Sequence, residues 1–189
     1  QRPLVALAAE GEDQEGGFQG TEADAILKCK DVAQGRDFDK GEVVEAIKML
    51  ERKKPDLNVD ALKAGQWRLC YTTGEKKREE QGLYTASGMQ IPTETLYTKQ
   101  VFSPSGEIEN GVYITDNFAF RFVGKWQLEK RRLTFAFDKI APRVFGQTLE
   151  IGYGPQNGLF NCIYADDEIF VARGGGGGLA VWVNKSCAP

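Results

Sequence analysis

Histidine is absent from this chain of 189 residues, and cysteine is scarce. The absence of histidine removes the usual general base, the commonest zinc ligand and every Ser-His or Cys-His nucleophile pair. The four cysteines, Cys29, Cys70, Cys162 and Cys187, form no Cys-x-x-Cys pair for metal or redox chemistry. We therefore predict a protein that is no enzyme and holds no cofactor or metal, with reduced thiols that are buried or incidental. A Cys70–Cys162 disulfide would require an oxidising compartment.

Net positive charge and long apolar runs are also lacking. The formal charge is −3 and the sequence pI is about 5.2, so no overall basic field attracts nucleic acid. The apolar runs fall far short of the ~20 residues that a membrane-spanning helix needs. One local exception is the basic run Lys130-Arg131-Arg132, with Lys125 and Arg121 nearby. It is either a surface site for anionic head groups or acidic loops, or solvated charge.

The sequence divides into three parts. Residues 1–20 are acidic and glycine-rich, which is typical of an extended tail that buries no core. Residues 21–64 form a helical segment. In it, Thr21 with Asp24 resembles a capping box, and Asp39 with Glu42 begins a second helix that Pro55 ends. Residues 65–189 form a β domain, since the apolar period changes there from helical to two.

From Gly65 onward the chain contains roughly eight to ten short alternating segments, punctuated by Gly, Asn, Asp and Pro. This pattern is typical of an antiparallel barrel or sandwich. We predict a mainly β fold, an antiparallel lipocalin-like β-barrel with short N-terminal helices and an extended N-terminal tail.

The last part of the domain reads as two strands joined by a run of five glycines, Gly174 to Gly178. Glycine supplies the positive φ angles that a hairpin needs. In the second strand, Leu179, Val181 and Val183 alternate with Ala180 and Trp182, so the strand is apolar on both faces. Such a strand has to be covered on both sides. The acidic run before the hairpin, Asp166-Asp167-Glu168, favours a turn or ion pairs over a catalytic or metal site.

A barrel of eight strands is wide enough either to be filled by its side chains or to hold one small ligand, and both alternatives stay open. The Gly-x-Trp of residues 65–67 is also similar to lipocalin-like barrels, where a cation covers the tryptophan. Arg173 or Lys185 is the candidate here. The candidate ligand-binding residues of the interior are large and aromatic: Trp67, Tyr71, Phe118, Phe120, Phe122, Phe135, Phe137 and Phe160.

Two motifs at opposite ends of the β domain resemble one family. Tyr164-Ala-Asp-Asp-Glu-Ile-Phe-Val-Ala-Arg173, followed by the glycine run and Leu179-Ala-Val-Trp-Val183, looks like the closing motif of plastid-lipid-associated proteins, the fibrillins or plastoglobulins. Gly65-Gln-Trp-Arg-Leu-Cys-Tyr-Thr-Thr-Gly74 is similar to the opening strand of that family. The sequence departs from the family pattern at Phe170, where a basic residue is frequent, and at Gly175, where Asp is usual.

The resemblance implies a non-enzymatic protein of the chloroplast stroma, peripheral to thylakoids or plastoglobules. It would bind or shield a lipid, quinone or carotenoid-type molecule. It also implies that a plastid transit peptide preceded Gln1, which is not a start methionine. The alternative is a non-catalytic linker or accessory subunit of a photosystem or antenna complex, docked through its tail, helices and loops. Ordering a polar tail costs about 1–2 kcal/mol of conformational entropy per residue, so such a tail is ordered only where contacts with a partner offset this cost.

Overall fold

The computed structural model describes residues 18–73 and 97–187, except for the side chain of Tyr153. The predicted tail therefore lies almost entirely outside the described residues. The helices are α1 (Glu22–Ala33), α2 (Lys40–Lys53) and α3 (Val59–Ala64). The strands are β1 (Gln66–Thr72), β2 (Tyr97–Phe102), β3 (Glu107–Thr115), β4 (Phe118–Glu129), β5 (Arg132–Ile140), β6 (Arg143–Val144), β7 (Gln147–Thr148), β8 (Ile151–Ala165), β9 (Ile169–Gly174) and β10 (Leu179–Asn184).

Eight of the strands close into a barrel. They follow the order β3-β2-β1-β10-β9-β8-β5-β4, each neighbour antiparallel, and β4 pairs again with β3. The two short strands β6 and β7 form a hairpin that joins this sheet where Arg143 pairs with Ala119 of β4. The predicted fold class, a mainly β protein with an antiparallel barrel and short N-terminal helices, is confirmed.

Both predicted helix caps are present. The Thr21 hydroxyl accepts a hydrogen bond from the Asp24 amide at 3.2 Å, and the Asp24 carboxylate accepts one from the Thr21 amide at 2.8 Å. The Asp39 carboxylate accepts from the Glu42 amide at 2.9 Å and begins α2. Helix α2 ends at Lys53, and its C-cap Lys54 takes a left-handed conformation with φ of 55° before Pro55. None of the described helices is long and apolar enough to cross a bilayer.

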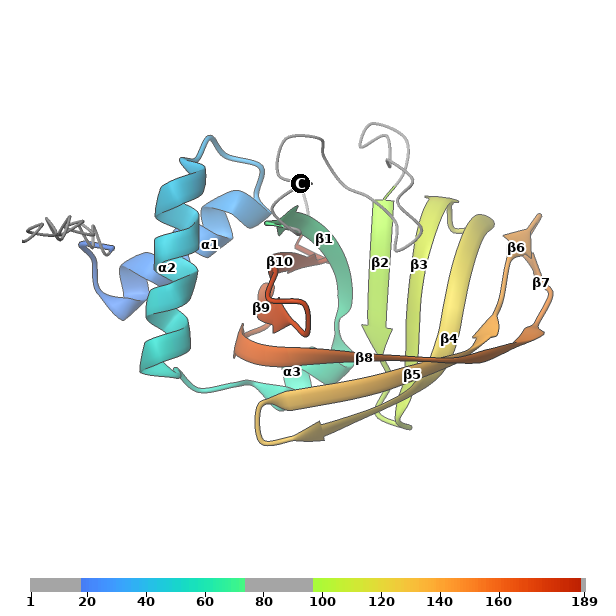
Figure 1. The fold of residues 1–189 in the computed structure, drawn as a ribbon. Coiled ribbons are helices and arrows are strands. Elements are labelled where there is room, and N and C mark those ends of the chain that lie inside the picture. The colour runs from blue at the N-terminus through green and yellow to red at the C-terminus, as the bar shows by residue number, and fades with distance from the viewer. Residues whose placement is uncertain (1–17, 74–96, 188–189) are drawn as a thin grey trace, which may run out of the picture.

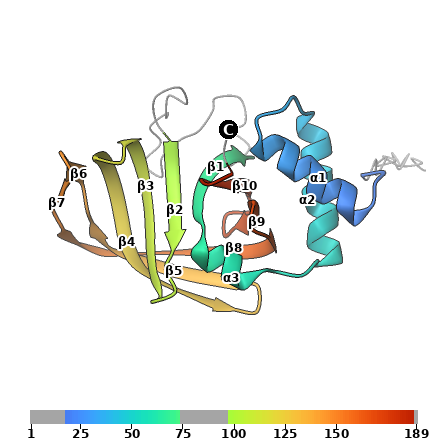
Figure 2. The same cartoon turned by 180° about the vertical axis from the view of Figure 1, so that it is seen from behind.

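Helix α1 covers the outer face of β1, β9 and β10, and helix α2 lies against β8, on the opposite side of the barrel from the β6–β7 hairpin (Figures 1 and 2). Their apolar faces and the outward residues of the strands form one buried cluster. Its central members are Cys29, Val43, Ile47, Leu50, Ile169, Val171, Val181 and Val183. The inward residues Ala180 and Trp182 of β10 are buried in the barrel. The prediction that this strand is covered on both faces is therefore confirmed.

The short helix α3 lies at one end of the barrel. Leu62 of α3 is buried in the interior cluster, and its carbonyl accepts a hydrogen bond from Trp67 Nε1 at 2.9 Å. The guanidinium of Arg131 fastens the connection before α3, because it donates to the carbonyls of Lys54, Pro55 and Ile163. This end of the barrel is thus closed by a helix and by a cation bound to backbone oxygens.

The glycine run forms the predicted hairpin between β9 and β10. The Gly174 amide donates to the Gly178 carbonyl at 2.8 Å, and the Gly177 amide donates to the Gly174 carbonyl at 2.9 Å. Within the run, Gly177 is the residue with positive φ, at 90°. One left-handed position therefore suffices for a turn to which the sequence assigns five glycines.

Candidate ligand-binding site in the barrel

A continuous array of aromatic rings runs through the barrel from its closed end to its rim. Each ring centroid lies 4.8 to 6.0 Å from the next. In order, the members are Trp67, Phe170, Trp182, Phe160, Phe135, Phe137, Phe122 and Phe120. Phe102 and Trp126 contact each other at 5.3 Å, and Phe102 contacts Phe170 at 5.9 Å. We call these ten residues the aromatic array.

The two ends of the aromatic array differ in exposure. Trp67 at the closed end is 0% exposed, whereas Phe120 at the other end is 48% exposed. Between them, Phe122, Phe135 and Phe160 are only partly buried. The closed end is thus a filled core of close-packed rings, and the half toward the rim leaves aromatic surface uncovered.

The uncovered half coincides with an open edge of the sheet. Within residues 18–73 and 97–187, strand β8 pairs with β5 alone from Ile151 to Gly158, because its pairing with β9 begins at Phe160. A hollow of about 810 Å³ lies near the end of this edge, where β9 meets β8. It is lined by Trp126, Phe135 and Phe160, by Gly174 and the two glycines after it, and by the charged and polar side chains that alternate with the rings, among them Lys125, Gln127, Arg132 and Thr134. The aromatic array therefore borders a hollow of the surface at this place, beside charged and polar side chains.

The structure places six of the eight candidate residues in the aromatic array: Trp67, Phe120, Phe122, Phe135, Phe137 and Phe160. Phe118 lies at the rim, where its ring contacts Phe145 at the tip of the β6–β7 hairpin at 4.8 Å. The expectation that Tyr71 faces the interior is wrong. The register between β1 and β10 shifts between Leu69 and Tyr71, and this bulge turns Tyr71 toward the helices, where its ring contacts Phe38.

The expected cation over Trp67 is also wrong. The Arg173 guanidinium binds Glu51 of α2, and Lys185 Nζ lies 5.7 Å from the ring centroid of Tyr97. Trp67 packs against Phe170 and donates its N–H to Leu62. The ring of Trp67 is thus covered by an aromatic neighbour in place of the expected cation, and its N–H is paired with a backbone carbonyl.

Sequence reasoning missed four members of the aromatic array: Phe102, Trp126, Phe170 and Trp182. The signal was present for Phe170 and Trp182, since they alternate with the helix-facing residues of β9 and β10. For Phe102 and Trp126 the alternation in the sequence is weak. Pairing across β2, β3 and β4 decides which face they occupy.

The acidic run Asp166-Asp167-Glu168 forms hydrogen bonds and ion pairs in the wall of the barrel. Asp166 accepts hydrogen bonds from the amides of Glu168 and Ile169 at 2.9 and 2.8 Å, and it pairs with Lys30 at 2.9 Å. These bonds lower the pKa of Asp166 although its burial opposes the shift. The acidic run is therefore a turn held by ion pairs, as predicted. No group of three potential metal ligands occurs among the described residues.

The basic run does not form one positive surface. Arg121 is 5% exposed and binds Glu109, the Ala141 carbonyl and the Thr148 hydroxyl. Lys125 pairs with Glu107 at 3.2 Å. Since the guanidinium of Arg131 is bound to backbone carbonyls, it is not available to an anionic partner either.

All four cysteines are free. Cys70 belongs to the side of the wall that packs on the helices, whereas Cys162 faces the barrel interior. Burial raises the pKa of the Cys70 and Cys162 thiols to about 12. The interpretation of reduced thiols therefore agrees with the structure, and the two candidates for a disulfide lie on opposite faces of the sheet.

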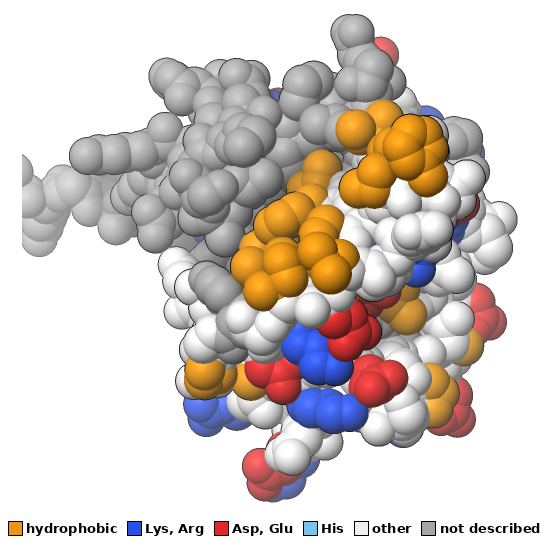
Figure 3. All heavy atoms as spheres, turned by 90° about the vertical axis from the view of Figure 1, so that its right-hand side faces the viewer, with side chains coloured by type: hydrophobic (Ala, Val, Ile, Leu, Met, Phe, Trp, Pro, Cys, Tyr) orange, Lys and Arg blue, Asp and Glu red, His pale blue; other side chains and the backbone are white. Residues whose placement is uncertain are grey.

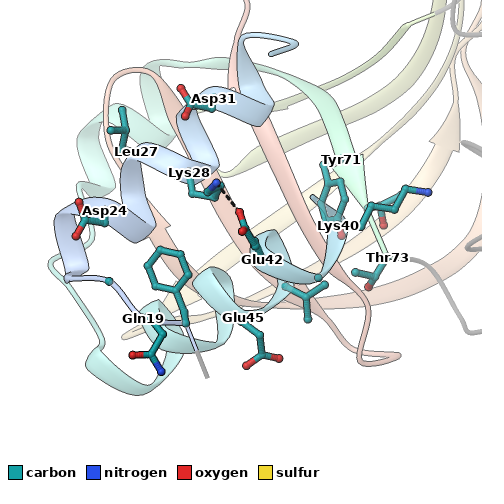
Figure 4. A pocket seen from close by; sticks show the side chains of 15 residues that line it. Gln19, Asp24, Leu27, Lys28, Asp31, Lys40, Glu42, Glu45, Tyr71 and Thr73 are labelled. Carbon is teal, nitrogen blue, oxygen red and sulfur yellow. Dashed lines mark hydrogen bonds and ion pairs between the residues drawn. The ribbon is translucent and has the colours of Figure 1, made fainter. Parts of the chain in front are cut away.

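A second hollow, of about 1130 Å³, lies between α1, α2 and the end of β1 (Figure 4). Its walls carry charged side chains, among them Asp24 and Lys40, and an ion pair joins Lys28 to Glu42 at 2.7 Å. Lys125 and Arg132 also place charge in the wall of the first hollow, but rings of the aromatic array line that hollow as well. The barrel interior is therefore the better candidate for an apolar ligand.

No protein-family model, no curated protein and no solved structure matches this chain.

Proposed function

We propose that this chain is a non-catalytic binding protein that holds or shields an apolar molecule of the lipid or isoprenoid class in its barrel. The observation that carries the proposal is the aromatic array, in which Phe122, Phe135 and Phe160 are only partly buried and the last two border a hollow of about 810 Å³. Burial of apolar area stabilises such a complex by about 25 cal/mol per Å² before the losses of association. The residues of the array supply no acid, base or nucleophile, which favours holding over conversion.

The resemblance to plastid-lipid-associated proteins gives this proposal its setting. In it, the protein acts in the chloroplast stroma, peripheral to thylakoids or plastoglobules, and a quinone or carotenoid-type molecule is the ligand. The two motifs that carry the resemblance contribute directly to the aromatic array. The opening motif supplies Trp67, and the closing motif supplies Phe170 and Trp182.

The experiment that tests this function is a titration of the intrinsic tryptophan fluorescence. All three tryptophans of the chain, Trp67, Trp126 and Trp182, belong to the aromatic array. A lipophilic quinone that enters the barrel is expected to quench them saturably, with one molecule bound per chain. Quenching that rises linearly with the quinone concentration would contradict the proposal.

A second candidate function is a non-catalytic linker or accessory subunit docked on a photosynthetic membrane complex. It is favoured by exposed apolar side chains at the rim, around the β6–β7 hairpin. They are Phe120 at 48%, Val144 at 52%, Phe145 at 81%, Leu149 at 63% and Ile151 at 49% exposure. Figure 3 faces this side of the molecule and shows hydrophobic side chains gathered there. The test is co-purification with thylakoid complexes, which loss of these side chains would weaken.

A further inference from the structure

Strand β2 carries two polar residues on its inner face. Gln100 is 3% exposed, and it pairs with Trp67 of β1 and Asn110 of β3. Because paired residues of neighbouring strands share a face, Gln100 points into the barrel with Trp67. Thr98 lies two residues earlier on the same face, nearer the rim.

These two side chains lack hydrogen-bond partners. Within the described part of the chain, the buried side-chain nitrogen and oxygen atoms without a partner are Gln100 Nε2 and Thr98 Oγ1. A buried donor that is left unpaired is unfavourable, and the large majority of buried polar side-chain atoms in proteins are paired. Two such atoms on adjacent inward positions of one strand indicate a missing partner inside the barrel.

Other buried polar groups of the barrel are paired within the chain. Trp67 Nε1 donates to the Leu62 carbonyl, and Trp126 Nε1 donates to the Ser103 carbonyl at 3.0 Å. On the outer face, Arg121 has three partners. Among the described residues, the buried side-chain atoms without a partner therefore lie on the inner face of β2, beside the aromatic array.

The surroundings indicate the chemistry of the missing partner. Gln100 Nε2 is a donor and the Thr98 hydroxyl can donate, so the partner has to accept. The neighbouring cations lie on the outer face, where Arg68 covers the ring of Tyr97 and Lys99 covers that of Tyr113. Within residues 18–73 and 97–187, an anionic carboxylate beside Gln100 and Thr98 would thus lack a counter-charge, whereas a neutral carbonyl oxygen needs none.

We propose that Gln100 and Thr98 hold the carbonyl oxygen of the bound molecule, so that the barrel favours a quinone or conjugated ketone over a hydrocarbon of similar shape. This inference rests on the proposed function, because it requires an apolar molecule in the barrel. The aromatic array contacts the ring and tail, and the two polar residues fix the position of the oxygen. Neutral donors inside apolar walls give orientation and selectivity.

The test compares two probes with the same tail, decylplastoquinone and decylbenzene, as competitors of the neutral fluorophore N-phenyl-1-naphthylamine. We expect Gln100→Met, which keeps the volume and removes the donor, to weaken quinone binding about tenfold and decylbenzene binding less than twofold. Thr98→Val is expected to act in the same direction. The control Gln66→Met changes an exposed residue of β1 and is expected to leave both affinities unchanged.

The outcomes separate this inference from the proposed function. Equal effects of Gln100→Met on the two probes, or no effect on either, would overturn the inference and leave the binding function standing. Failure of the wild-type protein to bind the fluorophore or either probe saturably would overturn both. A lower melting temperature of unliganded Gln100→Met would show that the amide is structural and would also overturn the inference. We expect this melting temperature to be equal or higher, because the variant buries no unpaired amide.

Discussion

Arg173 and Glu51 join the barrel to helix α2 through a two-point ion pair. Arg173 Nε lies 2.7 Å from Glu51 Oε1, and Nη2 lies 2.6 Å from Oε2. The same guanidinium donates to the Gly177 carbonyl at 2.8 Å, so it also holds the hairpin between β9 and β10. One side chain thus links a strand, a helix and a turn far apart in sequence.

This ion pair predicts a pH-dependent stability. Its hydrogen bonds lower the pKa of Glu51 below the ordinary 4.5 in the folded protein. The stabilisation is therefore complete above pH 4.5 and is lost as the pH falls through the lowered folded-state pKa. We expect Glu51→Gln to reduce the free energy of unfolding by about 1 kcal/mol at pH 7, because the pair is partly exposed. Urea denaturation at pH 7 and pH 3 measures the difference, and equal differences at both pH values would contradict this assignment.

Asp166 gives a second prediction about stability. Its carboxylate accepts two backbone amides and the hydroxyl of Tyr164 at 3.0 Å, and it pairs with Lys30. Asp166→Ala is expected to reduce the free energy of unfolding by about 2–3 kcal/mol, since it leaves these groups without a partner. The neighbouring Asp167 is exposed, so Asp167→Ala is the matched control with an expected change within about 0.5 kcal/mol. Similar losses of unfolding free energy in the two variants would show that removal of a negative charge, and not loss of the hydrogen bonds of Asp166, lowers the stability.

The rim hairpin gives a prediction that separates docking from folding. Phe145 is 81% exposed and has a φ of 52°, a left-handed conformation that asparagine adopts more readily than phenylalanine. Phe145→Asn is expected to leave stability unchanged or to raise it by up to about 1 kcal/mol. If the second candidate function holds, the same variant weakens co-purification with thylakoid complexes.

The control for the rim is Leu27→Asn on α1, at the opposite side of the barrel, where Leu27 is 55% exposed. It is expected to leave co-purification unchanged. Loss of co-purification with Leu27→Asn, together with full binding of Phe145→Asn, would place docking on the helices and contradict the role of the rim.

Local signals in the sequence predicted much of the fold correctly. The caps at Thr21 and Asp39 formed because their side chains bond within one turn of their own helix. The hairpin at Gly174 and the acidic turn at Asp166 are likewise decided by neighbouring residues. The doubly apolar pattern of β10 required a cover on each side, and the helices and the aromatic array supply it.

The errors arose where distant strands decide the outcome. The alternation of β1 assigns Tyr71 to the interior, but a bulge against β10 reverses its face. No periodicity in the sequence reveals such a bulge, because it is set by how two strands pair. The unpaired amide of Gln100 was equally hidden, since its burial depends on β1 and β3.

Two glycines of β8 permit a direct test of ligand binding in the barrel. A Cβ atom at Gly158 would lie 2.1 Å from the ring of Phe135, whereas one at Gly152 would have no atom within 4 Å. Gly158→Ala therefore has to displace Phe135 within the aromatic array, and Gly152→Ala makes the same chemical change in open space. Circular dichroism and melting temperature establish that each variant is folded.

The decisive measurement is the dissociation constant of decylplastoquinone for the wild type and these two variants, from saturable quenching of the tryptophan fluorescence. The account predicts one bound molecule per wild-type chain, an affinity roughly tenfold weaker in Gly158→Ala, and an unchanged affinity in Gly152→Ala. Equal affinities in all three folded proteins, or the absence of saturable quenching in the wild type, would contradict a ligand held among the aromatic rings of the barrel.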